Sequence, residues 1–500
     1  MREPLVSVII PAYKQEAYLG QAIASVLNQT YSRFEIIVVN DASPDNTAAV
    51  VRGFSDPRLR LVSHERNRGL PAARNTGMRA SAGELLALLD ADDFFHRDKL
   101  RAHVDFLQAH PEIAVTYNAR CELHHSSTEI REIWRPPLEV GLPELAAGFP
   151  FSPSDMVLRR NVAFEAGLFN ESCIWGAEDV DFPCRLALAG SRFASVDRPL
   201  NYRRYHAGTR GRHLLLEKRL EDYTQALQRI FADPRCPAQA QAFRNQAFLD
   251  KLLEVGYLAL ANGMTEFGQK CVREAIGLDA GILDGKMCPL VVNFLHRSIR
   301  DENQDHAEIL TRVALLLPPG LESLRPQFQK AIGQGYLLRG ARSVLWGQLE
   351  AADRHFARAA HSVERLDAEF LARLADQLIT LQQYFGDQRV GTVLRELKPR
   401  LRMVDARPLD RRLKACLAVN SGFRSFREGD YAQVPRKVIQ AVANNPGYVR
   451  NRGVLAILAR SLLISIRRSV PDPSIRDYGE GDEACGQAGK ANDSLAQSRG

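Results

Sequence analysis

Residues 85–93 are Leu85-Leu-Ala-Leu-Leu-Asp90-Ala-Asp92-Asp93, an apolar run that stops abruptly on three carboxylates. The apolar part is typical of a buried strand, so the carboxylates stand where the chain leaves the core. Clustered carboxylates repel one another and are costly to bury, and a hard divalent metal carrying a phosphate-containing ligand would explain them. The alternative is a solvated acidic turn before a helix that starts near Asp98.

The chain before this run alternates short β-branched segments with helical patterns. The predicted strands cover residues 6–10, 35–39, 60–62 and 85–89, and the predicted helices cover residues 17–29, 45–54 and 72–80. This alternation predicts an α/β domain with parallel strands and helical crossovers. Ligands of open α/β sheets bind at the carboxyl ends of the strands. We therefore expect Pro11, Asp41 and the acidic run to converge on one site.

The residues that follow the first two strands suit a nucleoside pocket. Pro11 and Tyr13 follow the first strand, and Asp41 follows the second. A proline and an aromatic ring form a flat wall for a base, and the Asp41 carboxylate accepts a hydrogen bond from a base N–H. Tyr13 could equally be an ordinary half-buried aromatic, with Ser43 or Asp45 merely capping the next helix.

A glycine turn at Gly69 precedes the helix that carries Arg74. A helix start together with a guanidinium favours phosphate or ribose oxygens. A capped surface helix is the alternative.

The rest of the chain divides into an irregular part and a helical part. Residues 100–215 contain possible strands near 113–118, 121–134 and 155–159 and a helix near 179–189, whereas helical periodicity runs from 216 to about 468. We expect three parts: an α/β domain at 1–215, an all-α domain at 216–470, and a disordered tail at 471–500 with few large apolar side chains.

One spacing recurs in the helical part. The sets are Gly263, Gly268, Val272, Ala275; Gly347, Ala352, Phe356, Ala359; and Gly429, Val434, Val438, Ala441. Small residues at such offsets let paired helices pack closely, so the pattern resembles degenerate tetratricopeptide-type hairpins. An irregular helical bundle is the alternative.

Composition excludes several classes of protein. The 500 residues are 45% apolar and 25% charged, which indicates a globular chain with more than one core. The net charge of +7 arises from dispersed arginines, which argues against nucleic acid as a partner. Eight cysteines without a CxxC pair indicate reduced thiols in the cytosol.

Neither a signal peptide nor a membrane span is predicted. The N-terminus becomes a strand almost at once, and the longest apolar stretch, residues 453–466, contains Arg460 and is too short to cross a bilayer. We expect a soluble or peripheral protein. Residues 451–468 form an apolar helix with basic ends, which suits either an interfacial helix on an anionic membrane or a helix that closes the helical domain.

Four segments, in their order and spacing, resemble the inverting family 2 glycosyltransferases of GT-A fold: SVIIPAYKQ, IIVVNDASPDNT, NRGLPAARNTG and LLALLDADD. The resemblance implies a nucleotide-diphosphate sugar held with Mn²⁺ or Mg²⁺. It implies that Asp92 is the metal ligand, that Asp90 lines the donor site and that Asp41 contacts the base. Asp93 looks like a group on the sugar side.

The resemblance extends to Trp175-Gly-Ala-Glu178-Asp179, which looks like the family's ED motif at a helix start. Asp179 would then be the general base on the acceptor hydroxyl, as an inverting transfer requires. The alternative for both acids is a favourable interaction with the helix dipole. Downstream, residues 202–206 resemble a YRxH-type segment, in which His206 would ligate metal or contact the diphosphate, unless it is an ordinary surface histidine.

Two residues depart from the family's pattern: Lys14 stands where many relatives have Asn, and Ala42 stands where Gly is common. The Gln-x-x-Arg-Trp segment of processive members is absent, so single transfers are expected. The resemblance covers about residues 5–210.

These observations predict a metal-dependent inverting transferase that moves one sugar, UDP-linked, to a hydroxyl of a glycan, a lipid-linked acceptor or another acceptor. The helical part would orient the acceptor or a protein partner, in the cytoplasm or peripherally at the inner membrane face. A sugar nucleotidyltransferase would need an N-terminal Gly-rich phosphate loop, which PAYKQEAYLG is not. The non-enzymatic alternative is a helical-repeat scaffold that binds a nucleotide sugar without turnover.

Overall fold

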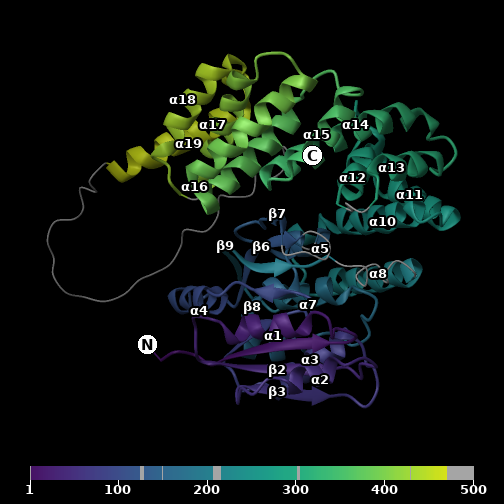
Figure 1. Cartoon of the computed structure of the whole chain (residues 1–500), viewed down its shortest axis with the longest axis vertical. Coiled ribbons are helices and arrows are strands. Elements are labelled where there is room, and N and C mark those ends of the chain that lie inside the picture. The colour runs from purple at the N-terminus through teal and green to yellow at the C-terminus, as the bar shows by residue number, and fades with distance from the viewer. Residues whose placement is uncertain are drawn as a thin grey trace. The chain divides into compact units, whose positions relative to one another are not determined.

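The computed structural model describes residues 2–123, 129–148, 150–205, 215–300, 304–427 and 429–469 (Figure 1). The chain forms two compact units, Met1–Ile332 and Gly333–Gly500. The predicted division at residue 215 stays a prediction; the helices that immediately follow it belong to the same unit as the sheet. The predicted disordered tail, 471–500, lies outside the described residues.

One mixed sheet organises the first unit. Its strands are β1 (Val6–Ala12), β2 (Phe34–Asn40), β3 (Leu59–Ser63), β4 (Leu85–Leu88), β5 (Phe94–Phe95), β6 (Val115–Leu123), β7 (Ile130–Trp134), β8 (Val157–Arg159) and β9 (Phe193–Arg203). Their order is β3-β2-β1-β4-β8-β6-β9-β5, with β7 beside β6. Strands β3, β2, β1 and β4 are mutually parallel, whereas β8 is antiparallel to both of its neighbours. The predicted α/β class is confirmed.

Helices cover both faces of the parallel strands. The helices in this part of the chain are α1 (Leu19–Leu27), α2 (Thr47–Arg52), α3 (Leu70–Ala80), α4 (Lys99–Ala109), α5 (Leu142–Ala147), α6 (Arg160–Glu165) and α7 (Glu178–Leu188). Val8 and Ile10 of β1 share a core with Leu19 of α1, whereas Ile9 shares one with Met78 of α3. Because successive side chains point to opposite faces, a strand covered on both sides needs apolar residues on both faces. Strand β1 is apolar except for Ser7, whose hydroxyl donates to Glu35.

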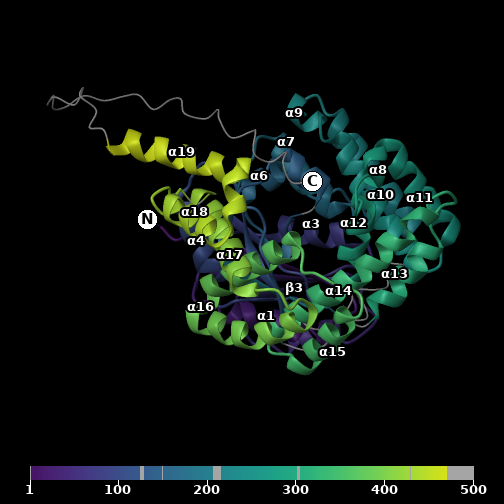
Figure 2. The ribbon, with the colours of Figure 1, turned by 90° about the horizontal axis from the view of Figure 1, so that it is seen from above.

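The remainder of the described chain is helical, as predicted. The helices are α8 (Leu216–Ala232), α9 (Ala238–Gln241), α10 (Arg244–Ala261), α11 (Thr265–Leu278), α12 (Pro289–Ser298), α13 (His306–Leu315), α14 (Arg325–Leu345), α15 (Leu349–Ala360), α16 (Ala368–Val404), α17 (Leu409–Arg427), α18 (Gln433–Asn444) and α19 (Arg452–Ser469). Figure 2 shows α10, α11, α12 and α13 together in the teal part of the chain. A kink at Gly386 divides α16.

The three sets of residues with the recurring spacing lie in helical hairpins that are built in the same way. Gly263, Gly347 and Gly429 each have a positive φ and make the turn before α11, α15 and α18, respectively. The other members of each set are buried on the helix that follows. Glycine adopts this backbone without the steric cost of a Cβ, which explains its recurrence at the turns. Whether the hairpins form a true repeat array stays a prediction.

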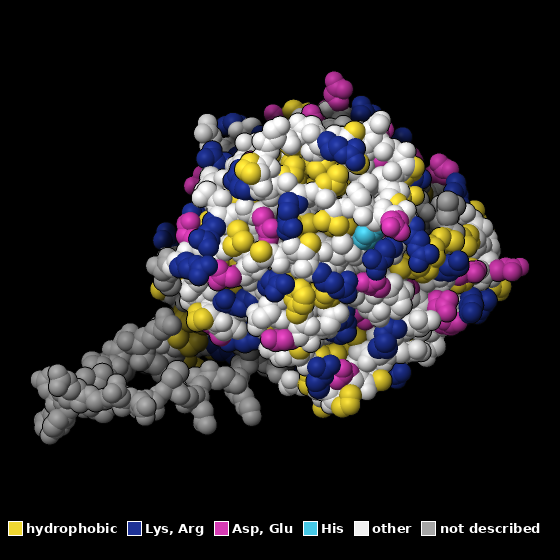
Figure 3. All heavy atoms as spheres, turned by 90° about the horizontal axis from the view of Figure 1, so that it is seen from below, with side chains coloured by type: hydrophobic (Ala, Val, Ile, Leu, Met, Phe, Trp, Pro, Cys, Tyr) yellow, Lys and Arg dark blue, Asp and Glu magenta, His cyan; other side chains and the backbone are white. Residues whose placement is uncertain are grey.

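The surface carries mixed charge. On the face drawn in Figure 3, Lys and Arg side chains are interspersed with Asp and Glu, and hydrophobic side chains gather only in small groups. This is the pattern expected from dispersed arginines. None of the helices in the described ranges is long and apolar enough to cross a membrane.

Candidate active site

A cleft of about 520 Å³ opens at the carboxyl ends of β1, β2 and β4. The lining groups include Pro11, Tyr13, Asp41, Asn67, Gly69, Asp90, Asp92, Asp93, Trp175, Gly176, Glu178, Arg203 and Arg204. The predicted convergence of three strand ends therefore occurs. Two predicted site residues, Arg74 and Asp179, are not in the lining, and His206 lies outside the described residues.

The three acids after β4 differ in their surroundings. Asp93 is almost fully buried and accepts a hydrogen bond from the backbone N–H of Arg204 (3.0 Å). Burial, and then the charges of Asp92 and Asp90, raise the pKa of Asp93 well above its usual range. The Arg204 guanidinium donates to the backbone carbonyl of Asp92 (3.1 Å). The carboxylates therefore stand close enough to oppose one another's ionisation, a conflict that a bound cation would relieve.

Arg74 lies beneath the cleft floor and joins two of its carboxylates. Its Nη2 is 2.7 Å from Asp90 Oδ1, and its Nη1 is 3.3 Å from Glu178 Oε1. Burial alone would lower the pKa of Arg74, but Asp90 and Glu178 outweigh burial and raise it. A guanidinium bound in this way fixes the carboxylates of Asp90 and Glu178 relative to each other. The expected contact of Arg74 with phosphate or ribose oxygens stays a prediction.

Asp41 organises the turn at the other end of the cleft. Its Oδ1 accepts from the backbone N–H of Arg68 (2.8 Å) and lies 2.7 Å from His64 Nδ1. Its Oδ2 accepts from the backbone N–H of Gly69 (2.9 Å). A carboxylate has about four acceptor positions, so Oδ2 retains capacity for a base N–H. His64 was not predicted, although it follows the end of β3 by one residue.

Glu178 and Asp179 begin α7 but face different ways. Glu178 lines the cleft and is 4% exposed. Asp179 lies near Arg219 and Tyr223 on α8, and burial, followed by the charge of Asp179, raises the pKa of Tyr223. Successive helical residues are about 100° apart around the axis, so the two side chains leave α7 in different directions. The charges of both nevertheless raise the pKa of Arg74.

In the described part of the chain, no group of three or more His, Cys, Asp or Glu side chains is already arranged around a metal position. The oxygen-rich end of the cleft at Asp90, Asp92 and Asp93 is nevertheless of the hard-ligand type that Mg²⁺ and Mn²⁺ take.

Residues 7–168 match the family model described as glycosyl transferase family 2. They form a glycosyl transferase family 2 domain. The predicted family is thereby confirmed over this range, which contains Asp41 and the three acids after β4. Glu178 and Asp179 lie beyond it.

Two relatives of the family 2 domain illustrate how far the similarity extends. An uncharacterized glycosyltransferase of Haemophilus influenzae is 36% identical over 133 residues, which is 26% of this chain and 53% of the relative. The UDP-Glc:alpha-D-GlcNAc-diphosphoundecaprenol beta-1,3-glucosyltransferase WfgD of Escherichia coli is 39% identical over 107 residues, 21% of this chain and 42% of the relative. The chain thus spans about half the length of the curated relatives it matches.

Solved structures also resemble the chain. TarS residues 1–349 of S. aureus has a TM-score of 0.42 at 19% identity, covering 67% of this chain and 91% of that one. The mannosyltransferase PcManGT of Pyrobaculum calidifontis, solved with GDP-Man and Mn²⁺, has a TM-score of 0.40 at 20% identity, covering 68% and 88%, respectively.

Both departures from the family pattern fall on unusual backbone. Lys14 and Ala42 have φ values of 57° and 54°, in the left-handed region that Gly and Asn tolerate best. Side chains from the second loop hold the first: Ser43 Oγ accepts from the Lys14 N–H (3.2 Å), and Asp45 Oδ2 accepts from the Glu16 N–H (3.2 Å). Neither Ser43 nor Asp45 is the N-cap of α2, which is Asn46.

Helix α8 holds the segment that leads into α7, a contact that the sequence did not reveal. Asp222 accepts hydrogen bonds from the backbone N–H groups of Trp175 (2.8 Å) and Ala177 (3.4 Å). The Lys218 ammonium lies 5.1 Å from the centre of the Trp175 ring. This helix follows the predicted domain boundary at 215 yet positions a wall of the cleft.

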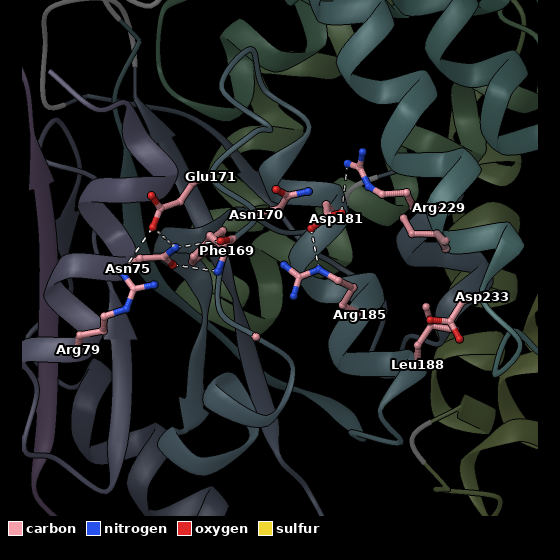
Figure 4. A pocket seen from close by; sticks show the side chains of 12 residues that line it. Asn75, Arg79, Phe169, Asn170, Glu171, Asp181, Arg185, Leu188, Arg229 and Asp233 are labelled. Carbon is pink, nitrogen blue, oxygen red and sulfur yellow. Dashed lines mark hydrogen bonds and ion pairs between the residues drawn. The ribbon is translucent and has the colours of Figure 1, made fainter.

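A second hollow, of about 440 Å³, is lined from α3, residues 167–171, α7 and α8 (Figure 4). The acids that line it, Glu171, Asp181 and Asp233, are each paired with an arginine. Asp181 accepts from Arg185 Nε (2.7 Å), and Glu171 accepts from Asn75 (2.9 Å) and Arg79 (3.4 Å). The carboxylates are already hydrogen-bonded within the protein. We therefore assign these residues a structural role, which is to hold residues 167–171, and do not propose a substrate site there.

Proposed function

We propose that this protein is a metal-dependent inverting glycosyltransferase that moves a single sugar from a UDP-linked donor to an acceptor hydroxyl. The observation that carries the proposal is the placement of the three acids after β4 in one cleft with Asp41. Asp41 would bind the base at one end, and the acids would hold the metal and diphosphate at the other. Pro11 and Tyr13 would form the wall against the base.

The acids fit a divalent metal on physical grounds. Burial and the neighbouring charges of Asp92 and Asp90 disfavour ionisation of Asp93, and a cation beside them removes that penalty. We assign Asp92 as the principal ligand, with Asp90 and Asp93 shaping the donor pocket around it. His206 remains a proposed further ligand. When bound, Mn²⁺ or Mg²⁺ would stabilise the charge of the departing diphosphate.

Two carboxylates, those of Glu178 and Asp179, are candidates for the general base. Glu178 faces the cleft, but its carboxylate is already ion-paired with Arg74 (3.3 Å). We therefore keep Asp179 as the proposed base, because catalytic contacts in a substrate-free structure often form only when the acceptor binds. Glu178 would orient Arg74 and, through it, Asp90.

The acceptor is proposed to be a glycan or a lipid-linked hydroxyl at the cytoplasmic face of a membrane. The relative WfgD acts, by its name, with UDP-Glc on a diphosphoundecaprenol-linked sugar. That similarity supports a UDP donor and a lipid-linked acceptor for this chain. A peripheral position would bring the cleft to such an acceptor without a membrane span, and a protein partner on the helical part stays a further proposal.

Donor turnover by the purified full chain tests the proposal. We expect hydrolysis of UDP-sugars that needs Mn²⁺ or Mg²⁺, stops with EDTA and falls at least about a hundredfold in Asp92→Ala. The reason is that Asp92 would hold a metal that supplies several kcal/mol of charge stabilisation. Asp105→Ala, which removes an exposed carboxylate on α4, is the matched control and should keep full activity. Absent turnover with UDP binding equal in Asp92→Ala would instead favour a non-catalytic scaffold.

A further inference from the structure

The end of the helical part has an unusual charge pattern. Residues 431–471 contain no Asp or Glu, although the chain carries 59 of these acids among 500 residues. The same stretch contains seven basic residues, Arg436, Lys437, Arg450, Arg452, Arg460, Arg467 and Arg468. Because their positions are scattered, no basic block is visible in the sequence. The absence of acids nevertheless leaves this segment strongly positive.

Helix α19 has two apolar sides. Val454 and Ile457 are buried in a core with Val438 of α18 and Val419 of α17. Leu455, Leu462 and Leu463 are on a different side of the helix and are 45%, 44% and 61% exposed, respectively. Their spacing of seven and eight residues places them in one stripe, which we call the leucine stripe. A helix whose only role was to close the helical domain would need to be apolar only on the side that carries Val454 and Ile457.

The leucine stripe is flanked by basic groups at its start. Arg450 and Arg452 are exposed immediately before and at the beginning of α19, and Arg460 lies partly buried between the leucines. An apolar stripe bordered by arginines, with no acid in the same segment, is complementary to a surface that is anionic outside and apolar below.

We infer that the leucine stripe of α19 binds in the plane of an anionic lipid bilayer. The leucines would enter the boundary between headgroups and acyl chains, and the arginines would contact the lipid headgroups. A second copy of the chain fits this surface poorly, because two segments of the same charge would be brought together. Nucleic acid would engage the arginines but leave the leucines in water. The inference goes beyond the proposed transfer reaction, since it rests on none of the cleft residues.

Vesicle co-sedimentation of the full-length protein, without any donor, tests the inference. We expect binding to phosphatidylcholine vesicles that contain phosphatidylglycerol, little binding to pure phosphatidylcholine, and weaker binding as salt is raised. Leu462→Ser with Leu463→Ser should weaken binding at least about tenfold, because each leucine loses its buried apolar area. Arg450→Gln with Arg452→Gln should reduce the preference for anionic vesicles by about fivefold per arginine.

Leu315→Ser is the matched control, because Leu315 is also 61% exposed but lies on α13. It should bind vesicles like the wild type. Substitutions at exposed leucines leave the core of α17 to α19 intact, so equal circular dichroism and melting will verify the fold. Two results would overturn the inference. One is unchanged vesicle binding in the double leucine variant. The other is a concentration-dependent dimer that the wild type forms and the double leucine variant does not. The leucine and arginine variants should hydrolyse the donor in solution like the wild type. A loss of vesicle binding can therefore be distinguished from a loss of the proposed activity.

Discussion

Lys14 and Ala42, in the two loops that follow β1 and β2, have left-handed backbone conformations. Such a conformation costs an L-residue roughly 1–2 kcal/mol, which the surrounding contacts must offset. At Lys14 the compensating contact is the hydrogen bond from its N–H to Ser43, whose own N–H donates to Asn40 Oδ1 (3.0 Å). The loops are therefore fixed by mutual contacts, and the family's usual Gly and Asn would need fewer of them.

Ala42→Gly should stabilise the protein. Relief of the left-handed cost exceeds the extra entropy that glycine has in the unfolded chain, so the free energy of unfolding should rise by about 0.5–1 kcal/mol. Urea unfolding measures the change. Ala24→Gly, inside α1, is the opposite-sign control and should destabilise by about 1 kcal/mol. Destabilisation by both substitutions would show that Ala42 is not strained.

The two acids of α7 can be separated by substitution. Asp179→Asn should reduce kcat by at least about a hundredfold with little change in the donor KM, since a general base contributes about 10²–10⁴ in rate. Glu178→Gln should raise the donor KM and reduce the melting temperature, because Arg74 would keep a buried charge with one fewer partner. The reverse assignment, with kcat lost only in Glu178→Gln, would make the cleft-facing acid the base.

At the scale of elements, α8 acts as a brace for the wall of the cleft. The Asp222 carboxylate accepts hydrogen bonds from two backbone N–H groups of the segment before α7, those of Trp175 and Ala177. Helices that follow the sheet in the sequence can therefore decide the geometry of a site built largely by the sheet.

Asp222→Ala should lower kcat at least about tenfold while donor affinity, measured with UDP, stays within about twofold. The reason is that the freed segment lets α7 move relative to the donor, and small displacements of catalytic groups cost much rate. Glu221→Ala, on the exposed side of the same helix, should change neither quantity. Equal losses of kcat and UDP affinity in Asp222→Ala would indicate general disruption instead of loss of positioning.

Helix α4 is fastened to the sheet by a buried ammonium. Lys99 Nζ donates to Asn118 Oδ1 (2.5 Å) and to the carbonyls of Ser154 (3.0 Å) and Asp155 (3.2 Å). Burial lowers the pKa of Lys99 to about 7, although Asp155 and Asp93 act against the shift. In the unfolded chain the pKa is about 10.4, so between these values the unfolded state binds the extra proton.

The free energy of unfolding should therefore rise with pH from about 7 to 10, by up to about 1.4 kcal/mol per pH unit from this group. That contribution is fully present above the unfolded pKa and is lost as pH falls through the folded value. Urea unfolding at pH 7.5, 8.5 and 9.5 should show a smaller slope in Lys99→Met than in the wild type. Lys270→Met removes an exposed lysine and should keep the wild-type slope.

The sequence predicted the parallel strands and their ends well, because β1, β2 and β4 are mostly apolar and polar residues follow within two positions of their ends. Strand β9 was not predicted. Its residues 197–199, Asp-Arg-Pro, interrupt the pattern, and the register of β6 against β9 shifts near Ala119 to accommodate them. His64 and Asp222 were missed for a different reason: their partners, Asp41 and Trp175, are brought to them only by the tertiary fold.

At the scale of the whole molecule, the cleft belongs entirely to the unit Met1–Ile332. A donor that binds the folded cleft should stabilise that unit alone. At a hundred times its dissociation constant, UDP with Mn²⁺ should add about 2.7 kcal/mol to the unfolding of the first unit. Hydrogen exchange should accordingly slow in β1, β2 and β4 and stay unchanged in α17 and α18. Uniform slowing in both units would mean that they unfold together.

Helix α14 runs from Arg325 to Leu345 through the division between the units at Ile332 and Gly333. Phe328 and Ala331 on its first half are buried in the core of the first unit. Proteases usually cut multi-unit proteins at an exposed linker, but here the division falls within continuous helix whose peptide bonds are already hydrogen-bonded. Nicking should therefore occur elsewhere, and a chain cut at residue 332 would end in a severed helix. Preparative separation of the two halves would have to leave α14 whole.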